Sequence, residues 1–526
     1  MKKDIVYQER KPMNKYQIIL AVSIISLIFD NIPKVLQLNT ISSGFANKLA
    51  WYPLIILSIL KIQEHYRERV TLEKRERYML RYILFFTCIL LLSNIQGLLI
   101  YPYYDELLSG PLTQIEKLPH LLQFFQDHGI AVSAQNILMG WVGVRSIKGT
   151  ILTVIYTFGF SFILYIIIKN RYSDCLQILK KCVFISVGVI SIYSCIELLY
   201  LAGNSVATSL LTFINPMLHP IAVNHGWWPP LLWKGQLRSV FVEPSRMGNY
   251  AAFALPFLWI YILKAKNILA PQTILIFFYT FLIFMTKART PVAMYWGLLA
   301  LFVIFTLVFT RRMYLKRVGS ILLISVLALL LSVGFIKAFM QQNNQTVTVE
   351  SYLSDNVGSL TKDNARSNGA RYALIRANFK TGAEHPFLGV GSQLNTAYTV
   401  HNFNEYDLQN REVQLWVRYF NEQGALKYVL DAMNEYVSKF AQHGIVGLFV
   451  FISPFFFILF KLFEKLRRRA EMEKLDTLAV ILSLIGSAVA GCNGSLVALY
   501  TYWIILAYAY AEIYQEPEGI KRLDIK

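Results

Sequence analysis

The sequence predicts an all-α polytopic membrane protein with about twelve transmembrane helices. The first observation is composition: the 526-residue chain is 55% hydrophobic, has a mean hydropathy of +0.43 and carries only 16% charged residues. Soluble domains carry about a quarter charged residues. The second observation is the recurrence of apolar stretches that approach the roughly 20 residues a spanning helix needs. The third is one long polar segment, 337–442, between two such stretches.

Each apolar stretch is expected to form one helix. In chain order they are 16–33, 49–62, 82–100, 150–168, 182–201, 248–263, 268–286, 291–310, 318–336, 443–460, 478–495 and 496–512. Lys and Arg concentrate in the links that follow the second, fourth, eighth and tenth stretches. Because cytoplasmic links of membrane proteins carry such an excess of positive charge, both termini are predicted in the cytoplasm and every long polar segment outside.

The chain is expected to divide into three parts. Residues 1–336 form a membrane domain of helices one to nine, with outer loops at 101–149 and 202–247. Residues 337–442 form a large extracytoplasmic loop between helices nine and ten. Residues 443–526 add helices ten to twelve and a cytoplasmic tail. A loop of that length among short links is usually functional, so we expect it to cover an active site and to provide half of it.

The composition also argues against several other classes of protein. The net charge of +19 comes mostly from the short links, and it therefore predicts no nucleic-acid partner. The five cysteines lie in or beside apolar segments without the spacing of a metal site. The sequence has no phosphate-binding glycine loop, zinc motif or serine nucleophile elbow. Metal-independent chemistry without a cofactor is the resulting prediction.

Basic residues in the outer segments are candidates for binding phosphate or pyrophosphate. The charge bias of cytoplasmic links does not account for them. Arginine suits this task because its planar guanidinium bonds two phosphate oxygens at once and stays charged. The alternative is that they are solvated surface residues or contact anionic lipid headgroups. The candidates are Arg238, Arg246, Lys287, Arg289, Arg366, Arg371 and Arg376.

A carboxylate at the membrane surface is the candidate for a general base. Glu243 stands directly before Pro244, and proline is favoured in the first turn of a helix. Glu243 is therefore expected either to begin a helix and pair with a nearby arginine, or to accept the proton of a sugar hydroxyl. The histidines His385, His401 and His443 are interpreted as turn, loop and helix-boundary residues.

Four stretches occur in a telling order along the outer segments and their borders. They are RSVFVEPSRMG at 238–248, MTKART at 285–290, NGARYALIRANFKTGAEHPFLGVG at 368–391 and MNEYVSKFAQHGIVGLF at 433–449. Together with the helix count and the large loop before the last helices, they resemble the superfamily of O-antigen polymerases and O-antigen ligases. This resemblance implies a glycosyltransferase with a GT-C-like helical fold in the bacterial inner (cytoplasmic) membrane.

The resemblance also implies the substrate and the reaction. The enzyme would polymerise undecaprenyl-pyrophosphate-linked oligosaccharide repeat units of an O-antigen, capsule or exopolysaccharide. A sugar hydroxyl would attack the anomeric carbon of the growing chain with inversion, and undecaprenyl pyrophosphate would leave. Fixed arginines would stabilise the charge on the departing pyrophosphate. Membrane lipids, a chain-length regulator and a flippase are the other partners that the resemblance implies.

Particular residues carry the resemblance. By motif position, Arg289 and Arg371 resemble the phosphate-binding arginines of the family, and Arg238 resembles their partner in the earlier loop. Arg371 and Gly382 also match the family spacing of an arginine, ten residues and a glycine. Arg246 lies in the stretch of Arg238, and Arg376 lies in the stretch of Arg371. These two arginines complete the predicted set of substrate-binding residues.

The chain departs from the ligase pattern at one place. Many ligases have a His-Asn pair before the glycine-rich start of the following helix, whereas this chain has Met433, Asn434 and Glu435 there. The resemblance therefore leaves the base open between Glu435 and Glu243, with His401, earlier in the loop, as a more distant substitute. Three alternatives to a polymerase also stay open: a ligase that transfers polysaccharide to an envelope acceptor, a flippase or other transporter, and a receptor or scaffold. A transporter is expected to place ionisable residues at mid-membrane, whereas here they collect in outer loops, with Glu197 as an exception at an outer helix end.

Overall fold

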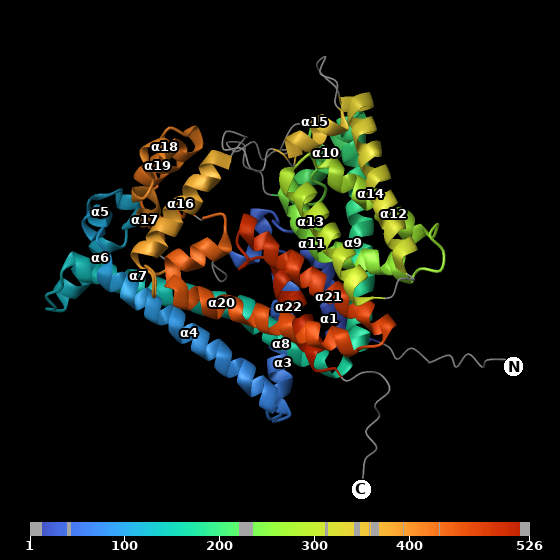
Figure 1. The fold of residues 1–526 in the computed structure, drawn as a ribbon. Coiled ribbons are helices and arrows are strands. Elements are labelled where there is room, and N and C mark those ends of the chain that lie inside the picture. Colours follow the sequence, from blue (N-terminus) through green and yellow to red (C-terminus); the bar gives the residue numbers. More distant parts are fainter. Residues whose placement is uncertain are drawn as a thin grey trace, which may run out of the picture.

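The described part of the chain is helical throughout. The structure, a computed structural model, describes residues 13–38, 44–219, 235–310, 314–340, 348–356, 358, 368–392, 394–430 and 432–515. These residues form helices and no strand (Figure 1). The all-α prediction is therefore confirmed.

The helix bounds are as follows. In chain order the α-helices are α1 (Lys15–Ile25), α3 (Trp51–Arg67), α4 (Lys74–Ile100), α5 (Tyr104–Ser109), α6 (Leu118–Asp127), α7 (Ala134–Val154), α8 (Phe160–Ile168), α9 (Tyr172–Leu201), α10 (Ser205–Leu218), α11 (Pro244–Lys264), α12 (Pro271–Met285), α13 (Arg289–Phe309), α14 (Leu315–Phe335), α15 (Val349–Asn356), α16 (Asn368–Glu384), α17 (Asn395–His401), α18 (Glu405–Leu408), α19 (Arg411–Gln423), α20 (Glu435–Arg468), α21 (Glu471–Val489) and α22 (Tyr500–Ile513). A π-helical turn, Ile155–Gly159, joins α7 to α8, and the 3₁₀ turn η11 (Ala490–Asn493) follows α21.

Six helical stretches in the described residues are long and apolar enough to cross a membrane. They are Lys74–Ile100, Ala134–Leu201, Arg289–Phe309, Leu315–Met340, Glu435–Arg468 and Glu471–Asn493. Shorter apolar helices cover Lys15–Ile28, Ser205–Leu218 and Pro271–Met285. The protein is thus a polytopic membrane protein, and the expected total of about twelve spans stays a prediction.

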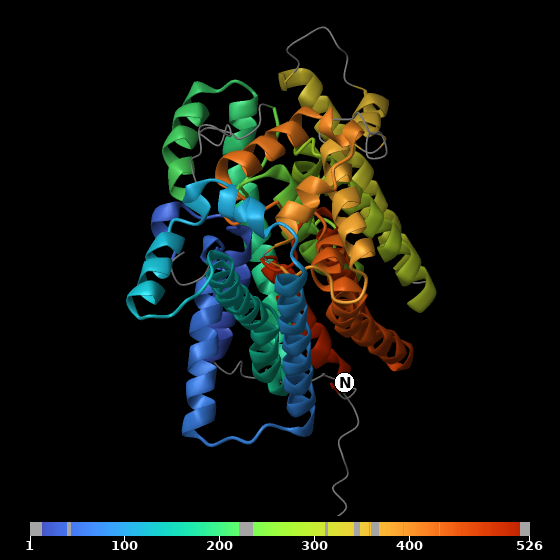
Figure 2. The same ribbon diagram turned by 90° about the vertical axis from the view of Figure 1, so that its left-hand side faces the viewer.

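The helices form two packed groups joined by α20. On one flank α4 lies beside α7 and α20, and on the other α9, α11, α12, α13, α14 and α21 pack together (Figures 1 and 2). An outer lobe of α5, α6 and α16–α19 covers the first flank, and α16 packs on α20. The predicted large loop thus contains five helices, α15 to α19, among its described residues.

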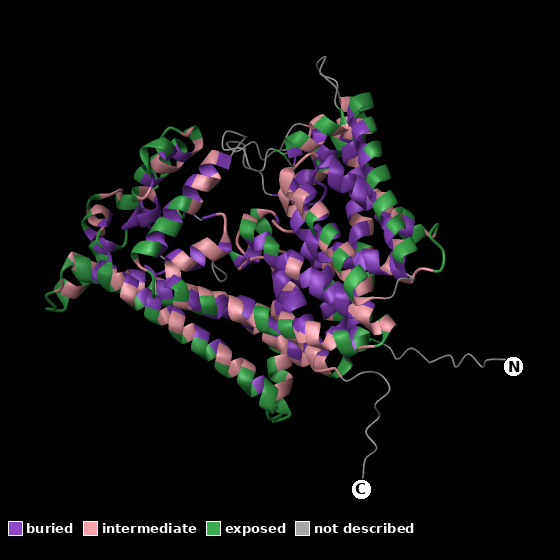
Figure 3. Ribbon diagram, viewed as in Figure 1, coloured by how far each residue is buried: buried purple, intermediate pink, exposed green. Residues whose placement is uncertain are grey.

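Helix α11 lies at the centre of the second group. It is buried along almost its whole length, whereas α4 and α14 expose apolar residues along one side (Figure 3). Small residues permit this close packing between membrane helices: a Cβ atom at Gly248 would lie 2.7 Å from Pro291 Cα on α13, and one at Gly486 would lie 2.7 Å from Ala252 O on α11. The start of α11 is therefore fixed beside the start of α13.

Helix α20 begins eight residues before the predicted position of 443 and is broken at Gly444. Gly444 has φ 62° and ψ −168°. The amide that the break frees in the next residue, Ile445 N–H, donates to Pro386 O at 2.7 Å, and Gly391 N–H donates to Gln442 O at 2.8 Å. A broken helix within a membrane is tolerated where neighbouring chain satisfies its backbone groups. The 385–391 segment provides that neighbour.

Gly444→Ala is expected to destabilise the fold by about 2 kcal/mol or more, because the backbone conformation of Gly444 is essentially restricted to glycine. The new Cβ atom would also lie 2.2 Å from Phe387 O. Thermal unfolding of the detergent-purified protein measures the effect. Gly297→Ala on α13 is the matched control, since a Cβ there meets nothing within 4 Å. Equal melting temperatures for the two variants would contradict this account of the break.

Candidate active site

Two of the predicted arginines are joined through helix α16. Arg289 is the first residue of α13, and its guanidinium donates a hydrogen bond to Asn368 Oδ1. Asn368 and Arg371 are three residues apart on α16 and so lie on one face of that helix. Arg371 Nη1 donates to Asn493 Oδ1 at 2.6 Å. Because neutral amide oxygens accept these two bonds, the bonds position both guanidinium groups without cancelling their charge.

Glu435 is tied to the same short segment as Arg371. It is the first residue of α20 and is only 3% exposed. Its Oε2 atom accepts hydrogen bonds from Ser495 Oγ at 2.8 Å and from Leu496 N–H at 2.9 Å. Since Asn493 and Ser495 are two residues apart, the segment after α21 holds Arg371 on one side and Glu435 on the other. A chain of contacts therefore links Arg289, Arg371 and Glu435 through α16 and the segment after α21.

A pocket of about 240 Å³ opens beside Glu435. Its polar lining consists of Thr150, Thr153, Ser392, Asn395, Thr396, Glu435, Ser438, Lys439, Gln442, His443 and Ser495. Glu435, Lys439 and His443 follow one another at intervals of four residues, so they share one face of α20. Lys439 Nζ lies 3.3 Å from Glu435 Oε1, and His443 Nδ1 lies 2.9 Å from Ser93 Oγ. A carboxylate, an ammonium and several hydroxyl and amide groups suit a polyhydroxylated ligand such as a sugar.

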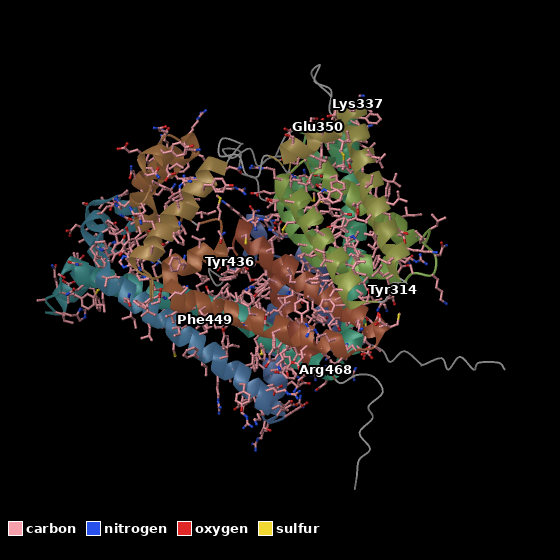
Figure 4. The ribbon with its side chains drawn as sticks, viewed as in Figure 1. Tyr314, Lys337, Glu350, Tyr436, Phe449 and Arg468 are labelled. Carbon is pink, nitrogen blue, oxygen red and sulfur yellow. The ribbon has the colours of Figure 1, made fainter. Side chains whose placement is uncertain are left out.

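The pocket lies where the outer lobe meets the membrane helices. Figure 4 labels Tyr436, the neighbour of Glu435, at the start of α20 between the outer lobe and the α11–α13–α21 group. Tyr436 also donates to Ala488 O at 2.7 Å and so fixes the start of α20 on α21. Burial raises the pKa of the nearby Glu412 carboxyl on α19, and the charge of Arg371 opposes that effect. Glu412 is thus a further ionisable neighbour of the site.

Arg238 occupies an interior position. It is 3% exposed, and the backbone N–H groups of Arg238 and Ser239 donate to Glu197 Oε2 at 3.1 Å and 2.6 Å. Its Nε atom lies 3.9 Å from Glu197 Oε1. The buried carboxylate of α9 thereby fixes the segment that leads into α11. These contacts support a positioning role for Arg238, and a contact with substrate stays a prediction.

Glu243 and Arg246 form a separate charged group at the start of α11. Glu243 is the N-cap residue, is partly buried, and accepts a hydrogen bond from Ser245 Oγ at 3.2 Å. Arg246 Nε lies 3.8 Å from Asp30 Oδ2, and Asp30 Oδ1 accepts from Val242 N–H at 3.1 Å. This arrangement supports the helix-start interpretation of Glu243. Its role as a base stays a prediction.

Lys48 belongs to this second charged group. Burial lowers the pKa of Lys48 to about 8, while Asp30 and Glu243 oppose the shift and Arg246 adds to it. Burial of the charged ammonium group of Lys48 costs folding free energy. This cost is complete below about pH 8, and it fades as the pH rises from there towards 10.5, the ordinary pKa of lysine. Lys48→Met should therefore stabilise the protein more at pH 7 than at pH 9.5, by a difference on the order of 1 kcal/mol.

Melting temperatures at the two pH values measure this difference. Lys34→Met is the matched control, because Lys34 is an exposed lysine in the same region of the chain. If Lys48→Met raised the melting temperature equally at pH 7 and pH 9.5, Lys48 would be charged at both pH values and its pKa would not be lowered.

The remaining candidates lie elsewhere. Arg376 forms an ion pair with Asp407 of α18, whose side chain is 1% exposed, and so braces the outer lobe. Its role in substrate binding stays a prediction. Arg366 lies outside the described residues. His401 Nε2 lies 2.8 Å from Glu106 Oε2 and joins α17 to α5.

Sequence reasoning missed several residues of the pocket. Lys439 stands in a stretch that was singled out, and the four-residue spacing of Glu435, Lys439 and His443 was available as a signal. Asn493 and Ser495 lie at the end of the predicted apolar stretch 478–495, whereas the helical turn ends at Asn493, and neither residue had a signal of its own. Their importance arises only from the tertiary contacts with Arg371 and Glu435.

Comparison with known families bears on the same part of the chain. Residues 273–452 match the O-antigen ligase family, and this range contains Arg289, Arg371, Glu435 and His443. A search of curated proteins gives no match. The family implies a membrane enzyme of the glycosyltransferase type that uses lipid-linked oligosaccharides. It also indicates a bacterial inner membrane as the location. This match supports membership of the chain in the superfamily of O-antigen polymerases and O-antigen ligases.

Proposed function

We propose that the protein polymerises undecaprenyl-pyrophosphate-linked oligosaccharide repeat units at the outer face of the membrane. The observation that carries this proposal is the short segment after α21, which binds Arg371 through Asn493 and Glu435 through Ser495, with Glu435 in the lining of a polar pocket. Two fixed guanidinium groups suit a diphosphate, and a carboxylate in a hydroxyl-rich pocket suits a sugar acceptor. The two halves of a glycosyl transfer are thus accommodated side by side.

The arginines are assigned to the pyrophosphate. Negative charge builds on the phosphate oxygens as the bond to the anomeric carbon breaks, and donors already aimed there stabilise the transition state. Asn368 and Asn493 hold Arg289 and Arg371 in place through neutral oxygens. The guanidinium of Arg371 has further N–H donors for a ligand.

The carboxylate is assigned to the acceptor. The attacking hydroxyl oxygen forms a bond to the anomeric carbon, the bond to the pyrophosphate oxygen breaks, and the electron pair leaves with the pyrophosphate. Glu435 takes the hydroxyl proton, and Ser495 and Lys439 orient its two oxygens. Attack from the face opposite the leaving group inverts the anomeric centre. Glu243 is the second candidate for the base.

The charge of the links supports an outward orientation of this site. Figure 4 labels Tyr314 and Arg468 towards one end of the helix bundle, with Lys337 at the other end of α14 and Tyr436 at the other end of α20. Tyr314 and Arg468 lie in the basic stretches 311–317 and 461–469, which are typical of cytoplasmic links. Under this orientation both termini are cytoplasmic, and a flippase would supply the substrate from within. A chain-length regulator is a further proposed partner.

A ligase is the second candidate function, because the matching family is described as O-antigen ligase. The two activities differ in the acceptor alone: a second lipid-linked unit for a polymerase, and an envelope acceptor for a ligase. Purified protein with one defined lipid-pyrophosphate oligosaccharide separates them. A ladder of extended products, unchanged by a chelator, supports a metal-independent polymerase. Transfer that needs an added envelope acceptor would overturn the polymerase assignment in favour of a ligase.

A further inference from the structure

A second, larger pocket lies at the opposite end of α11 from the candidate active site. Its volume is about 570 Å³, and residues of α9, α11, α12 and α21 line it. Helix α11 has 21 residues and therefore separates the two ends by about 30 Å. Lys264, the last residue of α11, lies in this pocket. The four helices adjoin one another in Figure 1.

One half of the pocket is positively charged. Its ionisable lining residues are Lys180, Lys181, Lys264 and Asp476. Asp476 Oδ1 lies 2.8 Å from Lys180 Nζ and 2.6 Å from Lys264 Nζ, so a single carboxylate oxygen serves two ammonium groups. Lys181 is exposed, and no hydrogen bond or ion pair joins it to another described residue. Three cations against one anion leave an excess of two positive charges.

The other half of the pocket is apolar and aromatic. Phe184 and Tyr261 meet edge to face with ring centroids 5.1 Å apart, and Phe257 and Ile260 form the buried wall. Ile185 is 52% exposed on the outside of α9, so the apolar half opens at the side of the bundle rather than into its interior. In a membrane protein an opening on the side of a helix bundle faces the acyl chains of lipid.

The combination of an anion-attracting end and an apolar opening suits an anionic lipid. Basic pockets between transmembrane helices on the cytoplasmic side suit anionic lipid headgroups. We propose that this pocket binds one anionic phospholipid, with its phosphate at Lys180, Lys181 and Lys264 and an acyl chain along Phe184 and Tyr261. The lipid would join the ends of α9, α11 and α21 at a distance from the chemistry.

This site is independent of the proposed reaction. Lys180, Lys181 and Lys264 all lie outside the matched range of 273–452, and none belongs to the candidate active site. The proposal therefore holds whether the protein is a polymerase or a ligase. Its test measures binding and stability, not activity.

Native mass spectrometry and thermal unfolding of the purified protein in neutral detergent test the proposal. Phosphatidylglycerol is expected to bind at one site and to raise the melting temperature saturably. Equal binding of phosphatidylcholine would overturn recognition of the charge. A matching rise with sodium phosphate alone would overturn the contribution of the acyl chain. Tighter binding of undecaprenyl phosphate than of phosphatidylglycerol would overturn the assignment to a phospholipid.

Single substitutions locate the site. Lys181→Gln removes the cation that no described residue pairs with, and it should weaken phosphatidylglycerol binding about fivefold. The matched control is Lys316→Gln, an exposed lysine near the start of α14 that does not line the pocket. Equal affinities in Lys181→Gln and Lys316→Gln would overturn the proposed site.

Gln272 allows a test that is safe for folding. It is exposed, lines the pocket and stands at the second position of α12, where a negative charge favours the helix. Gln272→Glu should therefore keep the fold and weaken phosphatidylglycerol binding, whereas Gln272→Lys should strengthen it. Opposite or equal changes would place the headgroup elsewhere.

Discussion

Arg371→Lys is expected to lower extension of the lipid-linked oligosaccharide by about 100-fold, as the loss of one fixed transition-state donor does in other enzymes. Lysine keeps the positive charge but has no planar fork. Arg371 donates one N–H group, on Nη1, to Asn493. It lies on the same face of α16 as Asn368, which accepts a hydrogen bond from Arg289. A lysine ammonium cannot hold Asn493 and present a parallel pair of donors to a phosphate at the same time.

Product ladders from purified protein measure the effect, with the amount of membrane protein held equal. Arg418→Lys is the matched control, since Arg418 is an exposed arginine of α19 in the same outer lobe and pairs with Glu422. We expect Arg371→Ala to be at least as defective as Arg371→Lys. Products of unchanged length from both variants would remove Arg371 from the site.

Glu435→Gln is expected to reduce extension by about 1,000-fold, within the range for loss of a general base. The substitution keeps the size of the side chain and an oxygen that can accept from Ser495 and Leu496 N–H. The variant should therefore reach the membrane in normal amounts. Ser495→Ala removes one positioning bond and should have a much smaller effect.

Glu243→Gln is the decisive comparison, because Glu243 is the other candidate carboxylate. It stands at the N-cap position of α11, in the charged group of Asp30, Lys48 and Arg246. If extension survives in Glu435→Gln and is lost in Glu243→Gln at normal protein levels, the base belongs at the start of α11. We expect the reverse.

The fold class follows from local sequence, whereas the helix ends do not. Apolar stretches predict where a chain meets lipid, because burial in a bilayer requires about 20 apolar residues. They do not predict how far a helix continues into water. Helices α4, α7, α9 and α20 begin at Lys74, Ala134, Tyr172 and Glu435, each before its predicted apolar stretch. The polar residues before each apolar stretch are helical as well, and hydropathy does not mark the residue at which the helix begins.

Three residues of the candidate site were named from the sequence, whereas their arrangement and most of the pocket lining were not. Motif order pointed to Arg289, Arg371 and Glu435, whereas the asparagines that hold the arginines could be identified only from tertiary contacts. The bonds Arg289–Asn368 and Arg371–Asn493 join residues 79 and 122 positions apart. No local pattern encodes such pairs. The ion pair of Arg238 with Glu197 also joins residues that are far apart in the sequence. Here an arginine that was predicted to bind substrate pairs with a buried carboxylate.

The junction between residues 385–391 and the break in α20 has a consequence for how the protein could diversify. Main-chain atoms make its bonds, Val390 N–H to Ala441 O and Ile445 N–H to Pro386 O among them. Apart from the glycines, side chains along both segments of the junction can therefore change without breaking these main-chain bonds. The polar lining of the adjoining pocket can then differ between proteins on one frame that main-chain bonds maintain.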